Sequence, residues 1–518
     1  MQTSQNHNNM SYSCCFLPSE SLKNYPSLLH NSDQYCTLDS SSTITNSFPN
    51  QNSPSSLSFS PENSPMLKQL RVETTVNGSH DNESCLTHDQ DDLSNKIREL
   101  ESVMLGSDAD ILNTYGAAMI PQEYDDSFLL EEERWRKMME VISRGDLKEM
   151  LCACAKAMSE NDMETTEWLM SELQKMVSIS GNPVQRLGAY MLEALVARLA
   201  SSGSTIYKAL RCKEPTGNEL LSYMHMLYEI SPYLKFGYLS ANGSIAEAMK
   251  GENEVHIIDF QINQGIQWIS LIKALAGRPN GAPKIRITGF DDSTSAFARG
   301  GGLNIVGERL SRIADSCNVQ FEFHAVGVSP SEVKLDDLDI RPGEAIAVNF
   351  AMMLHHLPDE SVDIRMNHRD RLLRLAKFLS PKVVTLVEQD SNTSNLPFFP
   401  RFVETMNYYL AVFESIDAAL PRDHKERINV EQHCLAREVV NLIACEGAER
   451  VERHEALKKW RSRFGRAGFS PYPLSSYVTS LIRQLQESYP GQYTLEERDG
   501  SLLLGWKNQS LVLSCAWR

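Results

Sequence analysis

The sequence predicts an α/β fold: a Rossmann-like, doubly wound parallel sheet with an α-helical cap and a disordered N-terminal tail. Five short apolar runs rich in β-branched residues are separated by stretches with helical periodicity, which is typical of strands buried on both faces and joined by helices. The first two runs end in acidic residues, at the edge where open α/β sheets place their ligands. The expected strands are 255–259, 284–290, 319–326, 345–350 and 382–388.

Helical signals surround these strands. Asp146 is a suitable N-cap for a helix beginning at Leu147, because its carboxylate can accept hydrogen bonds from the free amides of the first turn. Further helices are expected at 164–176, 183–199, 219–230, 240–249, 303–317 and 399–419, and hairpins between 493 and 518. Glycines 300–302 follow the wrong strand for a phosphate loop and are interpreted as a flexible helix entry.

The order of these signals resembles that of class I methyltransferases, with acidic residues after the first two strands and the turn 354–360 after the fourth. One part is missing. A methyl donor requires a glycine-rich turn after the first strand, since only glycine lets backbone amides approach the cofactor closely. Here that turn is 260–265, F-Q-I-N-Q-G, whose side chains would occupy the cofactor's space. The sequence therefore predicts no bound cofactor.

A second resemblance is more specific. The run V-H-I-I-D at 255–259 resembles the motif at the centre of the plant GRAS domain, and other signatures of that family follow in the expected order. The residues that carry the resemblance are Val255, His256, Ile257, Ile258, Asp259, Pro397, Phe398, Phe399, Arg401, Arg450, Glu452, Arg453, Trp506, Ser514, Ala516 and Trp517. The amino-acid sequence around these motifs is most similar to that of the branch associated with phytochrome A signalling. Several motifs in the expected order are together far more specific than one motif alone.

This resemblance implies a domain plan. A GRAS domain is expected at 146–518, with a first leucine repeat at 147–207, the central motif region at 226–291, a second leucine repeat at 307–339 and the two C-terminal signature regions at 348–440 and 443–518. The remaining residues, 1–145, are expected to be a tail. Positions 1–88 are rich in Ser, Asn, Gln and Pro, 93–105 is a candidate short helix, and 108–133 is either a segment that orders on a partner or a solvated linker.

Composition restricts the function further. The formal net charge of −17 argues against a broad basic surface that binds DNA phosphates. The 11 cysteines are dispersed without a paired C-x-x-C spacing, which predicts a reduced intracellular protein without a zinc site. Apolar runs stay short of the roughly 18 to 20 residues that a membrane span needs, and the N-terminus lacks a signal-peptide pattern.

Three side chains stand at the expected strand ends: Asp259, Asp292 and His355. Carboxylates there either bind a ribose or accept hydrogen bonds from helix-start amides, and the structural role is favoured. The pair His355–His356 suggests a general base, but without an assigned carboxylate partner a packed or hydrogen-bonded turn is favoured. The sequence therefore predicts neither catalytic nor metal-ligating residues.

The family resemblance implies a non-enzymatic transcriptional regulator, located in the nucleus alone or in both the nucleus and the cytoplasm, that binds DNA-binding transcription factors and acts in light or hormone signalling. It also implies a homo- or heterodimer with related proteins as an alternative assembly. An S-adenosylmethionine-dependent small-molecule methyltransferase is the alternative function, and a small-ligand receptor is a weaker third. Leu192, Val196 and Leu199 share one helical face and are the candidate partner surface, although packing within the core is the favoured reading of that periodicity.

Overall fold

The computed structural model describes residues 143–199, 217–291, 302–362 and 366–518, together with Glu133, Arg136, Met139 and Glu140. The predictions for 1–88 and 93–105, Asp292, and nearly all of the acidic stretch 108–133 lie outside the described residues. The glycines 300 and 301 of the predicted helix entry and the end of the first predicted leucine repeat, 200–207, also lie outside them, whereas the predicted strands and the remaining helices lie within.

The predicted helices are present, and apart from the helix that leads into β1 their ends shift by only a residue or two. The longer helices are α4 (Leu147–Ser159), α5 (Met163–Met176), α6 (Pro183–Leu199), α8 (Gly217–Ile230), α9 (Pro232–Ala248), α10 (Ile266–Ala276), α11 (Gly302–Ser316), α12 (His368–Phe378), α13 (Phe398–Ala419), α15 (Ala436–Ala444), α16 (Leu457–Arg466) and α17 (Ser476–Glu487). A short helix α14 (Lys425–Val430) leads through a π-helical turn, η4 (Glu431–Leu435), into α15, and a single turn, η3 (Leu354–His356), follows the fourth strand. The remaining single turns are η2 (Leu335–Leu338) and η5 (Gly447–Glu449).

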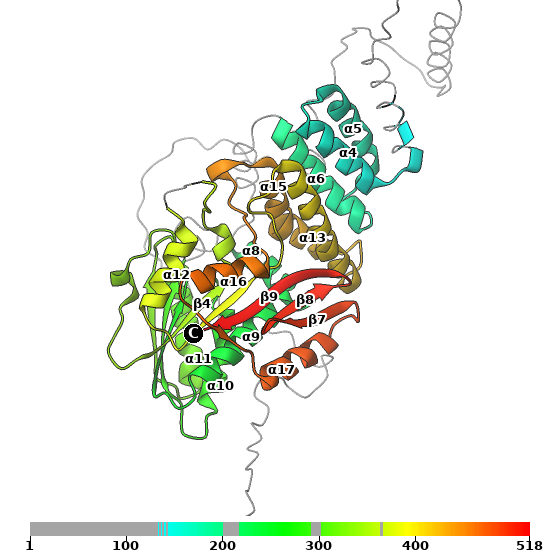
Figure 1. Cartoon of the computed structure of the whole chain (residues 1–518). Coiled ribbons are helices and arrows are strands. Elements are labelled where there is room, and N and C mark those ends of the chain that lie inside the picture. Colours follow the sequence, from blue (N-terminus) through cyan, green and yellow to red (C-terminus); the bar gives the residue numbers. More distant parts are fainter. Residues whose placement is uncertain are drawn as a thin grey trace, which may run out of the picture. The chain divides into compact units, whose positions relative to one another are not determined.

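The strands form one sheet with the order β3-β2-β1-β4-β5-β9-β8-β7 (Figure 1). They are β1 (Glu254–Asp259), β2 (Lys284–Phe290), β3 (Phe321–Val326), β4 (Ala345–Ala351), β5 (Val383–Gln389), β6 (Pro471–Tyr472), β7 (Tyr493–Arg498), β8 (Ser501–Trp506) and β9 (Gln509–Trp517). The first five along the chain pair in parallel, whereas β9 runs antiparallel to β5 and to β8. The predicted Rossmann-like fold class is confirmed, and the predicted hairpins extend the sheet beyond β5.

Helices cover both faces of the sheet. Neighbouring residues of a strand point to opposite faces, so each strand contributes side chains to both helical layers. Ile257 packs in the cluster that contains α10 and α11, whereas Ile258 packs in the cluster that contains α12 and α16. Both side chains are completely buried. This arrangement explains why β1 is an unbroken apolar run instead of an alternating one.

The helix that leads into β1 is longer than the sequence predicted. The segment 232–238 and the expected helix 240–249 form one helix, α9, which begins with Ser231 as its N-cap and Pro232 in its first turn. Gly237 does not break it. A Cβ at Gly237 would collide with Val387 of β5, so this glycine allows the helix to approach the sheet closely.

The α-helical cap consists of α4, α5 and α6 (Figure 1). Helix α5 packs on α4 and α6, both of which pack against α13, and α6 also packs against α15. The aromatic stripe of α13 is part of this core, as its helical spacing predicted, since Phe402, Tyr409 and Phe413 are all buried. A buried ion-pair group joins the layers. The Arg186 guanidinium of α6 contacts the Glu431 carboxylate at 2.9 Å, and Arg427 contacts the same carboxylate at 2.5 Å. Two arginines thus compensate one buried acid.

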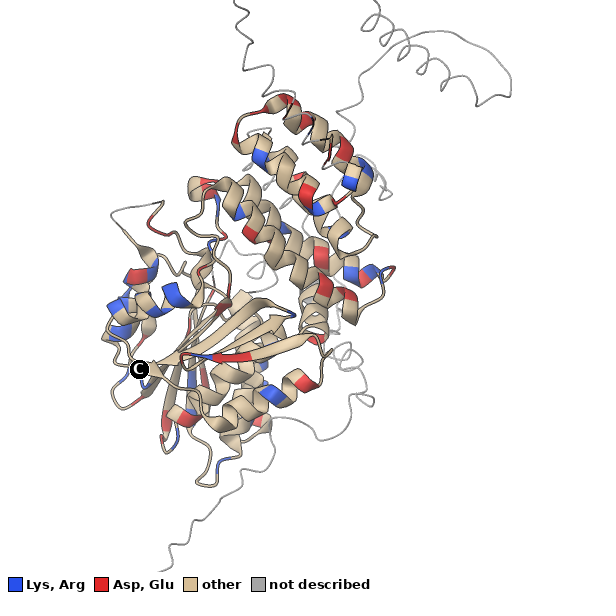
Figure 2. Ribbon diagram, turned by 45° about the vertical axis from the view of Figure 1, so that its right-hand side comes forward, with Lys and Arg blue, Asp and Glu red and all other residues tan. Residues whose placement is uncertain are grey.

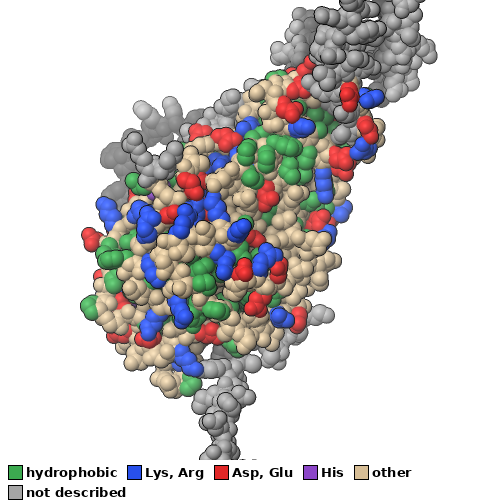
Figure 3. Space-filling model, viewed as in Figure 1, with side chains coloured by type: hydrophobic (Ala, Val, Ile, Leu, Met, Phe, Trp, Pro, Cys, Tyr) green, Lys and Arg blue, Asp and Glu red, His purple; other side chains and the backbone are tan. Residues whose placement is uncertain are grey.

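Charged residues are sparse on the central strands and concentrated on helices and loops (Figure 2). Lys and Arg side chains gather on the face that α12 and α16 form (Figure 3). The exposed members of this basic face are Arg374, Lys458 and Arg466. The protein therefore carries a locally basic surface on α12 and α16 although its formal net charge is −17.

Candidate functional site

A cavity of about 590 Å³ opens at the carboxyl ends of the parallel strands. Gln261 follows β1, Met353 follows β4 and Gln389 ends β5, and all three line it. The opposite wall comes from other helices and includes Tyr238 of α9 and Tyr409 of α13. Its size lies in the range of small-molecule sites, and its position is the edge where α/β sheets bind ligands.

Asp259, the last residue of β1, is buried and turned into the protein. Its carboxylate accepts hydrogen bonds from Trp268 Nε1 at 2.7 Å, from Asn349 Nδ2 at 3.2 Å and from the backbone N–H of Gln261 at 3.3 Å. Burial raises its pKa to about 6, although these donors oppose the shift. Because its oxygens are used to hold the turn and the next helix, this geometry supports the structural role.

The turn after β1 is filled by its own side chains. Ile262 is buried, and a Cβ at Gly289 would lie 2.7 Å from its Cδ1 atom, so Ile262 occupies the space directly above β2. Phe260 stacks between Phe290 and Phe350, with ring centroids 5.0 and 5.1 Å apart. Apolar side chains thus lie where a methyltransferase would present a glycine-rich turn.

The turn η3 after β4 is fixed by Glu388 of β5. The Glu388 carboxylate accepts hydrogen bonds from the backbone N–H groups of Met353 at 3.2 Å and Leu354 at 2.7 Å, and it contacts His355 Nδ1 at 2.5 Å. The sequence assigned no carboxylate partner to the pair His355–His356. The structure supplies one through a strand 33 residues further along the chain.

A second carboxylate, Glu452, lies among three histidines. Its Oε1 atom is 3.5 Å from His356 Nδ1, and its Oε2 atom is 3.5 Å from His355 Nε2 and 3.7 Å from His454 Nε2. Burial disfavours the charged forms, but the attraction between Glu452 and His356 prevails. The pKa of Glu452 falls to about 2 and that of His356 rises to about 9. Burial lowers the pKa of His454 well below its ordinary value.

Arginines hold the segment that carries Glu452 and His454. Arg450 donates to the carbonyls of Thr393 at 3.0 Å and Ser394 at 2.8 Å. Arg453 Nη1 donates to Asp359 at 3.1 Å, and the backbone N–H of Arg453 donates to the carbonyl of His355 at 3.0 Å. The predicted signature residues Arg450 and Arg453 thus position their neighbours instead of lining the cavity.

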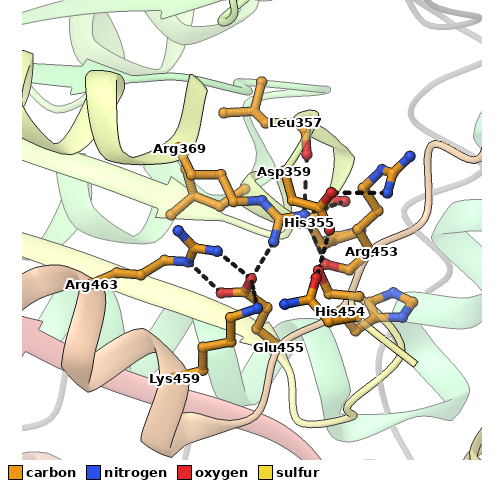
Figure 4. A network of polar contacts seen from close by, with 12 residues as sticks. His355, Leu357, Asp359, Arg369, Arg453, His454, Glu455, Lys459 and Arg463 are labelled. Atoms are coloured by element: carbon orange, nitrogen blue, oxygen red, sulfur yellow. Dashed lines mark hydrogen bonds and ion pairs between the residues drawn. The ribbon is translucent and has the colours of Figure 1, made fainter. Parts of the chain in front are cut away.

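A layer of ion pairs supports this segment from α12 and α16 (Figure 4). Arg369 and Arg463 point to the carboxylate of Glu455, with contacts of 2.7 and 2.6 Å. Arg369 also donates to the carbonyls of His355 at 3.3 Å and Arg453 at 2.8 Å. One buried guanidinium therefore links the turn after β4 to the Glu452 segment, which fixes their separation.

The other signature residues lie in the core of the sheet and the cap. Val255, Ile257 and Ile258 pack on the two sheet faces, and His256 joins a polar cluster described below. Pro397 precedes α13, and Phe398 lies under the Arg198 guanidinium at 3.9 Å. Phe399 packs against the cap core, and Arg401 donates to the Leu442 carbonyl at 2.8 Å. Trp506 donates to Glu414 at 3.1 Å, Ser514 contacts Ser240 at 2.5 Å, Ala516 pairs with Thr385, and Trp517 stacks on Phe464.

The three residues of the candidate partner surface differ in how far they are buried. Leu192 is 5% exposed and belongs to the cap core, as the core-packing alternative expects. Val196 and Leu199 are half-buried at the rim of the same core. Only these two of the three side chains offer accessible surface, so a role in partner binding stays a prediction for them.

Sequence reasoning found His355, His356 and Glu452 but not Glu388 or His454. Glu388 reads as an ordinary strand end, and His454 follows a signature without belonging to it. The run R-V-E-R-H-E at 450–455 was the available signal, since charged residues at adjacent positions that are all buried require partners. Which partners they contact depends on the fold.

A family model described as the GRAS domain family matches residues 147–518. The chain is 64% identical to the Scarecrow-like transcription factor PAT1 of Arabidopsis thaliana over 437 residues, covering 84% of this chain and 88% of that protein. It is 58% identical to the Chitin-inducible gibberellin-responsive protein 2 of Oryza sativa subsp. japonica over 466 residues, covering 90% and 84%. The crystal structure of SCL7 in Oryza sativa superposes with a TM-score of 0.64 at 34% identity, covering 72% of this chain and 99% of that one.

Proposed function

Because the chain belongs to the GRAS domain family, we propose that it is a non-enzymatic regulator of transcription that reaches promoters through DNA-binding transcription factors in the nucleus. One relative is named a transcription factor and another gibberellin-responsive, which supports a role in hormone or, with the resemblance to the phytochrome A branch, light signalling. Within the described residues, every helix is too short or too polar to cross a membrane.

The observation that carries the proposal is the filled turn after β1. Ile262 and Phe260 are buried where a methyl donor would need open backbone amides. Apolar side chains at this turn leave little room for backbone amides to approach a cofactor, which supports a non-enzymatic role for a fold that resembles that of methyltransferases. Calorimetry with S-adenosylmethionine tests the alternative function directly. We expect no appreciable heat, and micromolar affinity, about −8 kcal/mol, would favour the methyltransferase instead.

The partner role is tested at the rim of the cap. Val196→Glu places a charge on a half-buried position, so we expect a folded protein that loses its transcription-factor partner in a pull-down. Leu192→Glu is the matched control, because a charge at this core position should unfold the cap. Circular dichroism on both variants separates the two effects. A folded Val196→Glu protein that keeps every partner would remove this surface from the proposal.

Direct DNA binding is the competing route to a promoter. The basic face of α12 and α16 is the described surface on which it would depend. We expect the purified protein to bind a promoter fragment only when a partner is added. Tight, sequence-preferring binding by the protein alone at physiological salt, lost in a Arg374→Glu/Lys458→Glu double variant, would contradict the adaptor role.

A further inference from the structure

The cluster at the cavity wall contains three groups that converge without hydrogen bonds between them. His355 Nε2 and His454 Nε2 both face the same oxygen of Glu452, at 3.5 and 3.7 Å. The three ligand atoms lie within 4.8 Å of one another. We propose that His355, His454 and Glu452 bind a divalent transition-metal ion, zinc by the chemistry of this ligand set, at a site that opens into the cavity.

The distances suit such an ion. Zinc bonds histidine nitrogen and carboxylate oxygen at about 2.0 to 2.2 Å, so two ligand atoms in a tetrahedral site are about 3.4 Å apart. The contacts of Glu452 Oε2 with the two imidazoles are close to this value. They are too long for good hydrogen bonds, which would bring the same atoms to about 2.8 Å. The two imidazole nitrogens, which lie within 4.8 Å of each other, would have to move closer together to complete the site.

Two of the three ligand atoms are buried without a hydrogen-bond partner: Glu452 Oε2 and His454 Nε2. Their side chains are 8% and 1% exposed. A polar atom buried in this way costs about 1 to 3 kcal/mol, and more when it is charged. A bound cation would satisfy both atoms at once.

The Nδ1 atom of each imidazole, on the side away from Glu452, already contacts another side chain. His355 Nδ1 contacts the Glu388 carboxylate at 2.5 Å, and His454 Nδ1 contacts Thr393 Oγ1 at 3.2 Å. A carboxylate accepts but does not donate, so in the neutral imidazole of His355 the proton sits on Nδ1 and the lone pair of Nε2 points at Glu452. Metal-binding histidines are commonly oriented by such partners, which fix the tautomer and strengthen the ligand.

The protein supplies three ligands, and the cavity supplies access. His355 and Glu452 line the cavity, whereas His454 forms the buried side of the cluster. Two histidines and one glutamate with an open fourth position are a ligand set found in zinc proteins whose metal stays accessible. An ion here would present that position to water or to an oxygen or nitrogen donor of a small molecule in the cavity. The site is therefore a way for the cavity to recognise a ligand without the glycine-rich turn.

Zinc binding to the full chain, stripped with a chelator, tests the proposal by calorimetry. Glu452→Gln keeps the shape of the side chain but removes its charge, and His324→Gln is the control, a half-buried histidine of β3 outside the cluster. Loss of a second-shell partner commonly costs 10–100-fold in affinity, so loss of the ligand charge should cost at least about 100-fold. We expect His324→Gln to bind like the wild type. Equal zinc binding by wild type and a folded Glu452→Gln protein would overturn the proposal.

A measurement on the wild type alone covers the case in which Glu452→Gln fails to fold. X-ray absorption at the zinc edge reports the ligand atoms, and we expect two imidazoles and oxygen donors at about 2.0 to 2.1 Å. Thiolate sulfur at about 2.3 Å would place the ion on cysteines instead and would contradict the site. The test does not depend on the regulatory function, since it measures only where the metal binds.

Discussion

Two buried histidine clusters in this protein contain similar residues but differ in how completely their polar atoms are paired. In the β1 cluster, His256 Nε2 contacts Thr288 Oγ1 at 2.8 Å and His256 Nδ1 contacts Arg286 at 2.9 Å. Arg286 in turn donates to Glu344 Oε1 at 2.7 Å and to Asp339. In the cavity cluster, by contrast, Glu452 Oε2 and His454 Nε2 have no hydrogen-bond partner.

The difference shows that a buried histidine beside a carboxylate does not by itself mark a ligand site. The β1 cluster contains an arginine whose five donors satisfy its neighbours, so it is a closed structural unit. The cavity cluster has its arginines behind it, where Arg369 and Arg463 pair with Glu455. In the cavity cluster Glu452 Oε2 and His454 Nε2 are therefore left unpaired, which suits a bound metal cation.

The largest expected effect comes from opening the closed cluster. Arg286→Met removes the cation from beside Glu344, whose side chain is 5% exposed, and leaves a buried uncompensated charge. Breaking a buried pair in this way typically costs about 3–5 kcal/mol. Urea unfolding followed by circular dichroism measures it. Arg341→Met is the control, since its partly exposed pair with Glu322 should be worth less than about 1 kcal/mol. Equal losses in both variants would refute the closed-cluster description.

A smaller effect is expected from acid. Burial, and then the nearby Arg286 charge, lower the pKa of His256 to about 4. The unfolded chain takes up this proton near pH 6.5 while the folded protein resists it, so stability is full above pH 6.5 and is lost as pH falls toward 4. Between pH 7 and pH 5 the loss should be about 2 kcal/mol. His256→Gln should flatten the unfolding free energy over this range, and an unchanged slope would show that other groups control it.

The smallest effect concerns Asp259, which lies on the strand of the first cluster and at the end of the sheet where the second lies. Its raised pKa of about 6 means that it is ionised at pH 7.5 and mostly protonated at pH 5. Trp268→Phe removes a donor to the ionised form, so beyond a constant packing loss we expect a pH-dependent part of about 1.5 kcal/mol. That part should be present at pH 7.5 and largely absent at pH 5 in urea unfolding. A cost independent of pH would mean that Trp268 contributes only packing.

Much of the fold and part of the site could be predicted. Hydrophobic periodicity placed β1, β2 and β4 within a residue or so, because a buried strand or helix must show its apolar face locally in the sequence. It began the helix before β1 at 240 instead of 232, since the packing of Gly237 against Val387, which lets this helix lie close to the sheet, is a tertiary contact. His355 and Glu452 were singled out by position and by motif.

The sequence by itself determined the elements, the layer order and the family, since these depend on patterns repeated over short stretches and on ordered motifs. The tertiary structure alone decided that Glu388, Glu452 and His454 meet His355. These residues come from a strand and a loop up to 99 positions away from it, a separation that local periodicity cannot encode. It also decided which cluster is complete, because hydrogen-bond satisfaction depends on where an arginine side chain ends in space and not on its place in the chain.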